Sequence, residues 1–345
     1  MNLSFKNLLR KIKPSINKDN YENRINNELN FYKDCHNVHD LPDIFHYWSN
    51  KYLLPKQTPF GFSNPDEFFV SSCKKHCIKN LKLKVVKILS IGSGNGELEI
   101  KIASELSKAG VTNFSIECMD INKNMLDRTM ALAKDKGVGQ YIKTIKGDFN
   151  KWKPDSKYNL ILANQSLHHV LELEHLFDSI YNGLTQTGLF LTSDMIGQNG
   201  HMRWPEALEA LEPFWNELSK EKKYNQMLKR QEDTYINHDC STEGFEGIRA
   251  QDILSLLVQK FNFELFIPFA NIIMVFIDRP FGHNFDIKNP NDTEFIDRVH
   301  FKDEELMIKG TLKPTQMLAV MTKDNVAETK LLNPILTPQF CIRKF

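Results

Sequence analysis

Glycines occupy alternate positions at Gly92, Gly94 and Gly96, directly after a short apolar run. The segment from Lys87 to Glu97 reads Lys-Ile-Leu-Ser-Ile-Gly-Ser-Gly-Asn-Gly-Glu. Glycine permits a tight turn and lets a ligand press against bare backbone at the carboxyl end of a strand, where open α/β sheets bind ligands. The segment therefore predicts a binding site for a flat or extended ligand.

The residues after the last glycine restrict which ligand this is. A dinucleotide-binding G-x-G-x-x-G pattern requires glycine at position 97, but the chain has Glu97, whose charge at a helix N-terminus would repel a pyrophosphate. A phosphate-binding P-loop requires Lys followed by Ser or Thr, whereas Glu97 is followed by Leu98. The loop disfavours NAD and FAD and excludes ATP bound in that mode.

Two further acids favour a neutral or cationic nucleoside. Asp120 ends the second predicted strand, where a carboxylate can accept both hydroxyls of a ribose. Asp148 follows the third predicted strand, and the neighbouring Phe149 can lie against a purine face. Such a nucleoside would also tolerate Glu97.

Histidines follow the next two predicted strands. His168 and His169 come after the fourth strand, and His201 comes shortly after the fifth. A neutral imidazole is the side chain best suited to accept a proton near pH 7, so these three residues are the catalytic candidates. The alternative for His168 and His169 is a structural role at the start of the following helix.

Residues near the same edge are candidates for contact with the acceptor of a reaction. Each also has a structural alternative: Tyr47 and Trp48 can pack in the core, Asp194 can cap a helix, and Arg203 and Trp204 can belong to the start of a helix. These candidates are Tyr47, Trp48, Asp194, Arg203 and Trp204.

Elements of two kinds alternate along the chain and must position these residues. Short apolar runs predict strands, and the segments between most of them have apolar residues at helical spacing. The predicted strands are 85–91, 114–119, 141–145, 158–163, 189–193, 263–269 and 318–322. This alternation predicts an α/β fold with a doubly wound, mostly parallel, seven-stranded sheet.

The pattern also predicts five parts of the chain. They are a helical, aromatic-rich N-terminal cap (1–84), a core with the cofactor site (85–196), a substrate-side insertion or lid after strand 5 (197–247), the remainder of the core (248–325) and a tail (326–345).

Composition excludes several classes of protein. The chain has 345 residues, 41% of them hydrophobic, and a formal net charge of +1, so it can bury a large core and has no excess charge for nucleic acid. The apolar stretch 265–277 is shorter than the roughly 20 residues that a membrane span requires, so no transmembrane segment is predicted. The 6 cysteines show no paired framework, which favours free thiols and a cytoplasmic location.

Three possible metal ligands with sulfur or nitrogen donors have the spacing that places them on one face of a helix. Cys73, His76 and Cys77 lie at i, i+3 and i+4. A zinc site built on such a set normally has a second matching pair, and the sequence nearby offers none. We therefore predict no metal site.

Four motifs together resemble those of the class I S-adenosylmethionine-dependent methyltransferases. They are Ile-Gly-Ser-Gly-Asn-Gly (91–96), Met-Asp-Ile-Asn-x-x-Met-Leu (119–126), Lys-Gly-Asp-Phe (146–149) and Tyr-Asn-Leu-Ile-Leu-Ala-Asn-x-x-Leu-His-His-Val (158–170). The resemblance covers residues 85 to about 195. It implies a Rossmann-like methyltransferase core, S-adenosyl-L-methionine as cofactor and S-adenosyl-L-homocysteine as product.

The resemblance also implies roles for single residues. The methionyl part of the cofactor would lie against the glycine loop, the ribose beside Asp120, the adenine between Asp148 and Phe149, and the sulfonium near Asn164. The complete predicted cofactor set is Gly92, Ser93, Gly94, Gly96, Asp120, Ile121, Asp148, Phe149 and Asn164. The family often has an acid where this chain has Ser90, which predicts a weaker or water-mediated contact to the cofactor's amino group.

The expected reaction is methyl transfer to a small-molecule or carbohydrate (glycan) acceptor, with oxygen favoured as the acceptor atom. Family members that methylate exocyclic base amines have Asn or Asp followed by Pro-Pro-aromatic, whereas here Asn164 is followed by Gln-Ser-Leu. The alternatives are an RNA or protein methyltransferase and a catalytically silent, cofactor-binding partner subunit. Monomer and homodimer both remain open.

Overall fold

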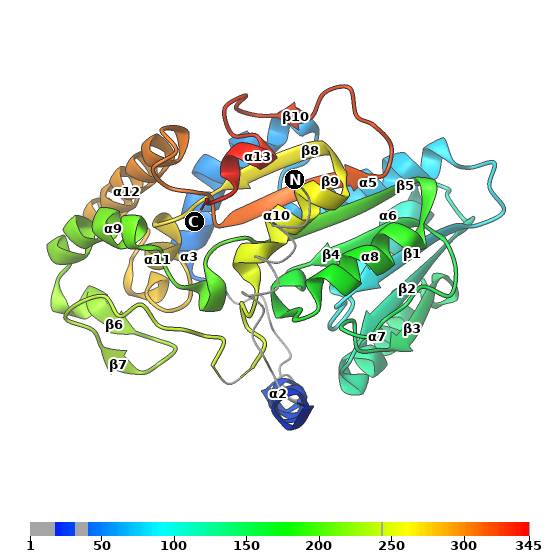
Figure 1. Cartoon of the computed structure of the whole chain (residues 1–345), viewed down its shortest axis with the longest axis horizontal. Coiled ribbons are helices and arrows are strands. Elements are labelled where there is room, and N and C mark those ends of the chain that lie inside the picture. The colour runs from blue at the N-terminus through cyan, green and yellow to red at the C-terminus, as the bar shows by residue number, and fades with distance from the viewer. Residues whose placement is uncertain (1–17, 32–40, 243, 345) are drawn as a thin grey trace, which may run out of the picture.

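The computed structural model describes residues 18–31, 41–242 and 244–344. Within them the main sheet has eight strands in the order β10-β8-β9-β5-β4-β1-β2-β3 (Figure 1). The strands are β1 Val86–Ile91, β2 Phe114–Asp120, β3 Ile142–Lys146, β4 Tyr158–Asn164, β5 Leu184–Met195, β8 Asn262–Phe269, β9 Gln316–Thr322 and β10 Lys330–Leu331. A separate two-stranded ribbon consists of β6 Tyr224–Asn225 and β7 Arg230–Gln231.

The predicted α/β class and mostly parallel sheet are confirmed. Strands β1 to β5 run parallel to one another, whereas β9 pairs antiparallel with both β5 and β8. The predicted count of seven strands is wrong, because β10 pairs with β8 through Lys330↔Leu265 and Leu331↔Phe266. A two-residue strand has no detectable alternation, and it forms here because β8 offers it an unpaired edge.

The helices occupy both faces of the sheet and one end of it. They are α2 Lys18–Phe31, α3 Asp43–Trp48, α4 Leu54–Gln57, α5 Pro65–Lys79, α6 Glu97–Lys108, α7 Lys123–Asp135, α8 Leu173–Gly183, α9 Pro205–Glu217, α10 Ala250–Lys260, α11 Ile273–Ile277, α12 Pro290–Ile308 and α13 Pro338–Cys341. Ile88 of β1 packs into the core that includes α5 and α6, and its neighbour Leu89 packs into the core that includes α8 and α10. The sheet therefore separates two apolar layers.

Strand β5 differs from its prediction at one end. It begins at Leu184, directly after α8, although the sequence predicts a turn at Gly188 and a strand start at Leu189. The pairing with β4 shows why, because Tyr158 pairs with Leu184 and Leu160 with Leu189. The residues of β5 between these two pairs interrupt the regular pairing with β4, and Gly188 is one of them.

Residues 197–247 form α9, the β6–β7 ribbon and long connecting loops. Figure 1 shows α9 beside α11 and α12, at the opposite end of the molecule from β3. Trp215 of α9 is buried and packs on Phe281 and Tyr235, so the segment has apolar anchors of its own. Its two ends meet where the Gly200 N–H donates to the Gly247 carbonyl at 2.9 Å.

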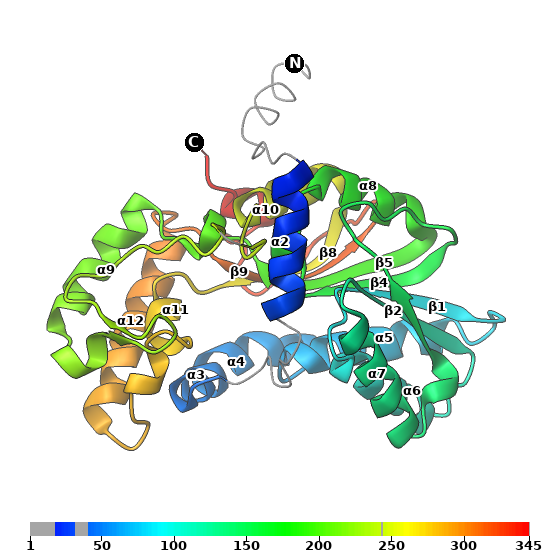
Figure 2. The ribbon, with the colours of Figure 1, turned by 90° about the horizontal axis from the view of Figure 1, so that it is seen from below.

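Helix α2 lies between the two ends of the molecule, as Figure 2 shows from below. Tyr21 in this helix contacts the segment after β3, and Arg24 donates to the carbonyls of Ser241 and Gly244. Of the predicted N-terminal cap, residues 1–17 and 32–40 lie outside the described residues. Among the helices that the structure describes, none has the length and apolar character needed to cross a membrane.

Candidate active site

The glycine loop (residues 92–96) connects β1 to α6 as the sequence predicts. All three glycines have positive φ, at +70° for Gly92, +54° for Gly94 and +75° for Gly96. A Cβ at Gly92 would lie 2.5 Å from the Ser166 Cβ, and one at Gly96 would lie 2.3 Å from the Thr129 Cγ2. A Cβ at Gly94 would meet nothing within 4 Å, so the first and third glycines permit close packing and the middle one leaves bare backbone beside open space.

Asp120 is buried behind this loop at the end of β2. Its Oδ2 accepts the Gly94 N–H at 3.0 Å, and its Oδ1 accepts the Asn122 N–H at 2.8 Å. Burial raises the pKa of this carboxyl, and the two backbone hydrogen bonds oppose that rise. The carboxylate is therefore fixed against the loop, and Ile121 continues the chain beside it.

An orphaned polar atom shows that the loop suits a polar ligand. The Ser93 hydroxyl oxygen is buried and has no hydrogen-bond partner among the residues that the structure describes. Buried hydroxyls normally have a partner, so a ligand that supplies one would stabilise this loop. Together with Gly94 and Asp120, this atom fits the hydroxyl and amino acid groups of a nucleoside such as S-adenosyl-L-methionine.

The predicted adenine residues lie after β3, and one of them, Asp148, contacts α2. Phe149 is buried, and Asp148 accepts a hydrogen bond from the Tyr21 hydroxyl at 2.7 Å. Burial, reinforced by this bond to Asp148, raises the pKa of Tyr21. The sequence did not identify Tyr21 as a site residue, because α2 has no apolar periodicity that ties it to the core.

An unpredicted acid stands behind Ser90, the position where the related family often has an acid. Glu99 of α6 is only 2% exposed and accepts a hydrogen bond from the Ser90 hydroxyl at 2.5 Å. Burial raises the pKa of Glu99 to about 7, although the bond from Ser90 lowers it. The chain thus places a carboxyl group beside this position from the helix that follows the loop.

Asp194 is the anchor of a second polar group at the same edge of the sheet. It is fully buried at the end of β5, and its Oδ2 accepts the N–H groups of Ser166 and Leu167 at 2.9 and 2.7 Å. Its Oδ1 lies 2.7 Å from the His168 Nδ1. The Ser166 hydroxyl donates to the Ile91 carbonyl at 2.8 Å, which joins this group to the glycine loop.

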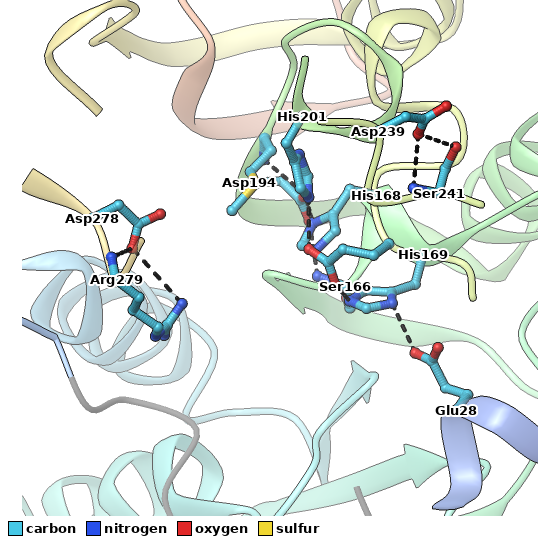
Figure 3. A network of polar contacts seen from close by, with 12 residues as sticks. Glu28, Ser166, His168, His169, Asp194, His201, Asp239, Ser241, Asp278 and Arg279 are labelled. Atoms are coloured by element: carbon cyan, nitrogen blue, oxygen red, sulfur yellow. Dashed lines mark hydrogen bonds and ion pairs between the residues drawn. The ribbon is translucent and has the colours of Figure 1, made fainter. Parts of the chain in front are cut away.

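The three predicted catalytic histidines come from two separate parts of the chain and lie close together (Figure 3), and the Glu246 carboxylate contacts all of them. The Glu246 Oε1 lies 2.6 Å from the His201 Nε2 and 3.5 Å from the His168 Nε2. Its Oε2 lies 3.4 Å from the His169 Nε2, and the His169 Nδ1 lies 2.8 Å from the Glu28 Oε1. We call His168, His169, His201, Asp194 and Glu246 the histidine cluster.

Charges within the histidine cluster stabilise one another. Burial disfavours the charged form of His168, but Asp194 and Glu246 outweigh it and raise its pKa to about 10. Burial lowers the pKa of His201. Burial of Glu246 favours its neutral form, yet His168 outweighs that effect and its pKa falls below the usual range. The carboxylates of Asp194 and Glu246 thus lie in contact with the imidazoles of the cluster, and their opposite charges stabilise each other.

His201 reaches the cluster from a backbone conformation that L-residues rarely adopt. Its φ is +56°, and Gln165, directly before the Ser166 turn, has a φ of +51°. Such conformations cost free energy and persist where the surroundings fix them, often at functional sites. The pairing of Gly200 with Gly247 supplies this fixation, because it places His201 and Glu246 on adjacent chain segments.

The remaining predicted site residues lie at different places. Asn164 ends β4 and pairs with Ser193, next to the histidine cluster in the chain. The Arg203 guanidinium donates to the His201 carbonyl at 2.9 Å. The other three predicted acceptor contacts have partners outside the histidine cluster: the Tyr47 hydroxyl donates to Asp297, Trp48 donates to His300 and Trp204 packs under Arg343.

Comparisons with known proteins agree with this architecture. A family model described as a methyltransferase domain matches residues 82–261. A malonyl-[acyl-carrier protein] O-methyltransferase of Ilyobacter polytropus is 30% identical over 131 residues, which is 38% of this chain and 47% of that protein. A second one from the same organism is 26% identical over 191 residues, 51% of this chain and 66% of that protein. The chain thus spans about half to two thirds of these relatives.

Among solved structures, the chain is similar to an O-methyltransferase from a trans-AT polyketide synthase of Brevibacillus brevis, in complex with S-adenosyl-L-homocysteine. The two are 15% identical with a TM-score of 0.44, over 83% of this chain and 81% of the other. The fold and loop define a Rossmann-like domain of the class I S-adenosylmethionine-dependent type. The match over residues 82–261 shows that the chain belongs to the methyltransferase domain family, and its cofactor is S-adenosyl-L-methionine.

Proposed function

We propose that the protein transfers the methyl group of S-adenosyl-L-methionine to an oxygen atom of a small or carrier-linked acceptor. The observation that carries this proposal is the histidine cluster, which adjoins the glycine loop through the contact from Ser166 to Ile91. A hydroxyl acceptor must lose its proton as it is methylated, and imidazoles are the usual proton acceptors near neutral pH.

The residues of the chain have separate tasks in this reaction. When bound, the cofactor supplies an electrophilic methyl carbon. The bond from this carbon to sulfur breaks, its electron pair stays on the sulfur, and a new bond joins the carbon to the acceptor oxygen. Gly94, Ser93 and Asp120 bind the cofactor, and the rest of the site aligns the acceptor and excludes water. Alignment contributes most to such a displacement, because the chemistry needs little covalent help.

We propose that His169 accepts the proton that the acceptor hydroxyl loses. Its Nδ1 is held by Glu28 at 2.8 Å, and its Nε2 faces the Glu246 carboxylate at 3.4 Å. Glu28 belongs to α2, so this helix would complete the site when it lies in the described position. His168 is less suited, because its side chain is only 4% exposed, whereas that of His169 is 14% exposed, and because its Nδ1 is held by the fully buried Asp194.

The relatives include proteins named for methylation of oxygen and one named for methylation of carbon. The names of the two Ilyobacter polytropus proteins describe O-methylation of a carrier-linked malonyl group. A sterol 24-C-methyltransferase of Gibberella zeae, 24% identical over 151 residues, is named for methylation of carbon. The imidazoles and carboxylates of the histidine cluster are well placed to take up a proton that oxygen loses on methylation, which favours oxygen over carbon as the acceptor atom.

The test is to identify the atom that receives the methyl group. The protein would be incubated with S-adenosyl-L-methionine labelled with ¹³C in the methyl group and with acceptors that carry hydroxyl, carboxyl or amino groups, free or as carrier thioesters. The ¹³C chemical shift of the product distinguishes O-methyl from N-methyl and C-methyl. O-methylation supports the proposal, and a product methylated only on nitrogen or carbon contradicts it.

Two variants connect that activity to the site. His169→Gln should lower turnover by roughly 100-fold or more, because it removes the proton acceptor, and should leave cofactor affinity near normal. His175→Gln is the matched control, since His175 follows in α8 and its Nε2 contacts the Trp152 carbonyl at 2.9 Å, outside the histidine cluster. Equal turnover in both variants would contradict the assignment of His169.

A further inference from the structure

Three ligand atoms in the histidine cluster converge on one point. They are nitrogens of His168 and His201 and a carboxylate oxygen of Glu246, and all lie within 4.8 Å of one another. Two of these contacts are the 2.6 Å separation between the His201 Nε2 and the Glu246 Oε1 and the 3.5 Å separation between the His168 Nε2 and the same oxygen. Zn–N and Zn–O bonds in tetrahedral geometry place ligand atoms about 3.3 Å apart, and the observed separations lie on either side of that value.

Hydrogen bonding alone accounts poorly for His168. Its Nδ1 lies 2.7 Å from the Asp194 Oδ1, so that nitrogen carries the proton in the neutral ring. Its Nε2 lies 3.5 Å from the Glu246 oxygen, which is longer than an ordinary N–H···O bond. In the protonated ring a proton on Nε2 occupies the space between these two atoms, and a metal ion at that position would replace it.

The outer contacts of the cluster have the form found at metal sites. A metal-bound histidine commonly donates its second N–H to a carboxylate, which fixes the ring orientation. Asp194 provides this contact to His168 and is itself held by the N–H groups of Ser166 and Leu167. On the other side, His201 is held in its positive-φ conformation, which is an independent sign of a built site.

We propose that His168, His201 and Glu246 bind a divalent first-row transition-metal ion of the zinc class. Two imidazoles and one carboxylate are a donor set of catalytic zinc sites, which keep a further coordination position open. Magnesium and calcium prefer oxygen ligands throughout, so the two nitrogens select against them. This site differs from the sequence expectation of no metal and lies apart from Cys73, His76 and Cys77.

The ligand set rests on the contacts above, whereas the role of the ion in the reaction rests on the proposed function. An ion with an open position lowers the pKa of a hydroxyl bound to it, which favours loss of the proton to a nearby acceptor. His169 is outside the ligand set and pairs with Glu28, so it stays available to receive that proton. The site would then serve to bind and polarise the acceptor oxygen.

The experiment measures metal binding directly, without cofactor or acceptor. Full-length protein free of any histidine tag is stripped with a chelator and titrated with Co²⁺, whose visible absorption reports nitrogen and oxygen ligands in a four- or five-coordinate site. Zn²⁺ binding is measured by calorimetry, with Mg²⁺ as the contrasting ion. The proposal predicts one tight Zn²⁺ per chain, a Co²⁺ spectrum that Zn²⁺ abolishes, and no comparable binding of Mg²⁺.

Variants locate the ion. His201→Gln and Glu246→Gln should weaken Zn²⁺ binding by 100-fold or more, and Asp194→Asn should weaken it by about 10- to 100-fold because it disturbs only the outer contact. His175→Gln and His76→Gln are controls that should bind normally, the latter excluding a site on α5. Circular dichroism confirms that each variant is folded.

Two outcomes would overturn the proposal, namely no Zn²⁺ uptake by the folded, stripped protein, or equal uptake in Glu246→Gln and in His175→Gln. Either would leave the cluster as a hydrogen-bonded group. The result is separable from that of the proposed function, because binding is measured without methyl transfer. If the protein binds zinc but methylates nitrogen or carbon, the metal site is supported and the proposed oxygen acceptor is contradicted.

Discussion

Replacing Glu99 by glutamine should make the stability of the protein less sensitive to pH. The carboxyl group is 2% exposed, and burial raises its pKa from 4.5 to about 7, against the effect of the hydrogen bond from Ser90. Because folding raises this pKa, the contribution to stability is fully present below the unfolded pKa of 4.5 and is lost as the pH rises through about 7.

The size of the effect follows from the two pKa values. Their difference corresponds to about 3 kcal/mol once the group is fully ionised in both states. Between about pH 5.5 and about pH 8 the wild-type free energy of unfolding should fall by about 2 kcal/mol relative to that of Glu99→Gln. The glutamine keeps the size of the side chain and cannot ionise.

Urea unfolding at several pH values measures this difference. The matched control is Glu105→Gln on the same helix, because Glu105 is partly exposed and pairs with Lys108 at the surface. Its unfolding free energy should follow that of the wild type across this range. If Glu99→Gln and the wild type showed parallel pH dependence, the buried carboxyl would have to be ionised at little cost, and the account of the Ser90 position would be wrong.

Four further changes test the cofactor side of the site. Asp120→Ala should weaken binding of S-adenosyl-L-homocysteine by roughly 1–3 kcal/mol through loss of charged hydrogen bonds; unchanged affinity in calorimetry would refute the ribose assignment. Gly96→Ala should destabilise the protein by roughly 1–3 kcal/mol, because its Cβ would lie 2.3 Å from the Thr129 Cγ2. Gly94→Ala has open space and should cost less in the same urea assay, and equal losses would contradict the close packing. Tyr21→Phe removes the hydrogen bond to Asp148 and should speed amide exchange in α2, whereas unchanged exchange would show that this bond does not hold the helix.

Local sequence signals predicted where the glycine loop and Asp120 lie at the edge of the sheet, whereas their contact with the cofactor stays a prediction. The glycines and Asp120 follow strands that have clear apolar runs, and the carboxyl ends of parallel strands meet at one edge. The same reasoning placed His168, His169 and Asp194 at that edge, because each follows a strand. Leu98, Ile102 and Leu106 recur at helical spacing, and α6 forms over them.

The residues that sequence reasoning missed depend on contacts between distant segments. Glu246 lies in a loop without periodicity and meets the histidines only because Gly200 pairs with Gly247. Glu28 belongs to a helix with few apolar residues, and its contact to His169 spans most of the N-terminal half of the chain. The adjacent pairs Glu246-Gly247 and Gly200-His201 were the available signal, since glycine beside an ionisable residue often marks a close approach of backbone.

A crystal structure with S-adenosyl-L-homocysteine shows whether the glycine loop and the histidine cluster serve one reaction. The ligand should contact Gly94 and Asp120, and its sulfur should face the space bounded by His168, His169 and Glu246. A ligand bound elsewhere, or a sulfur directed away from those three side chains, would contradict this prediction.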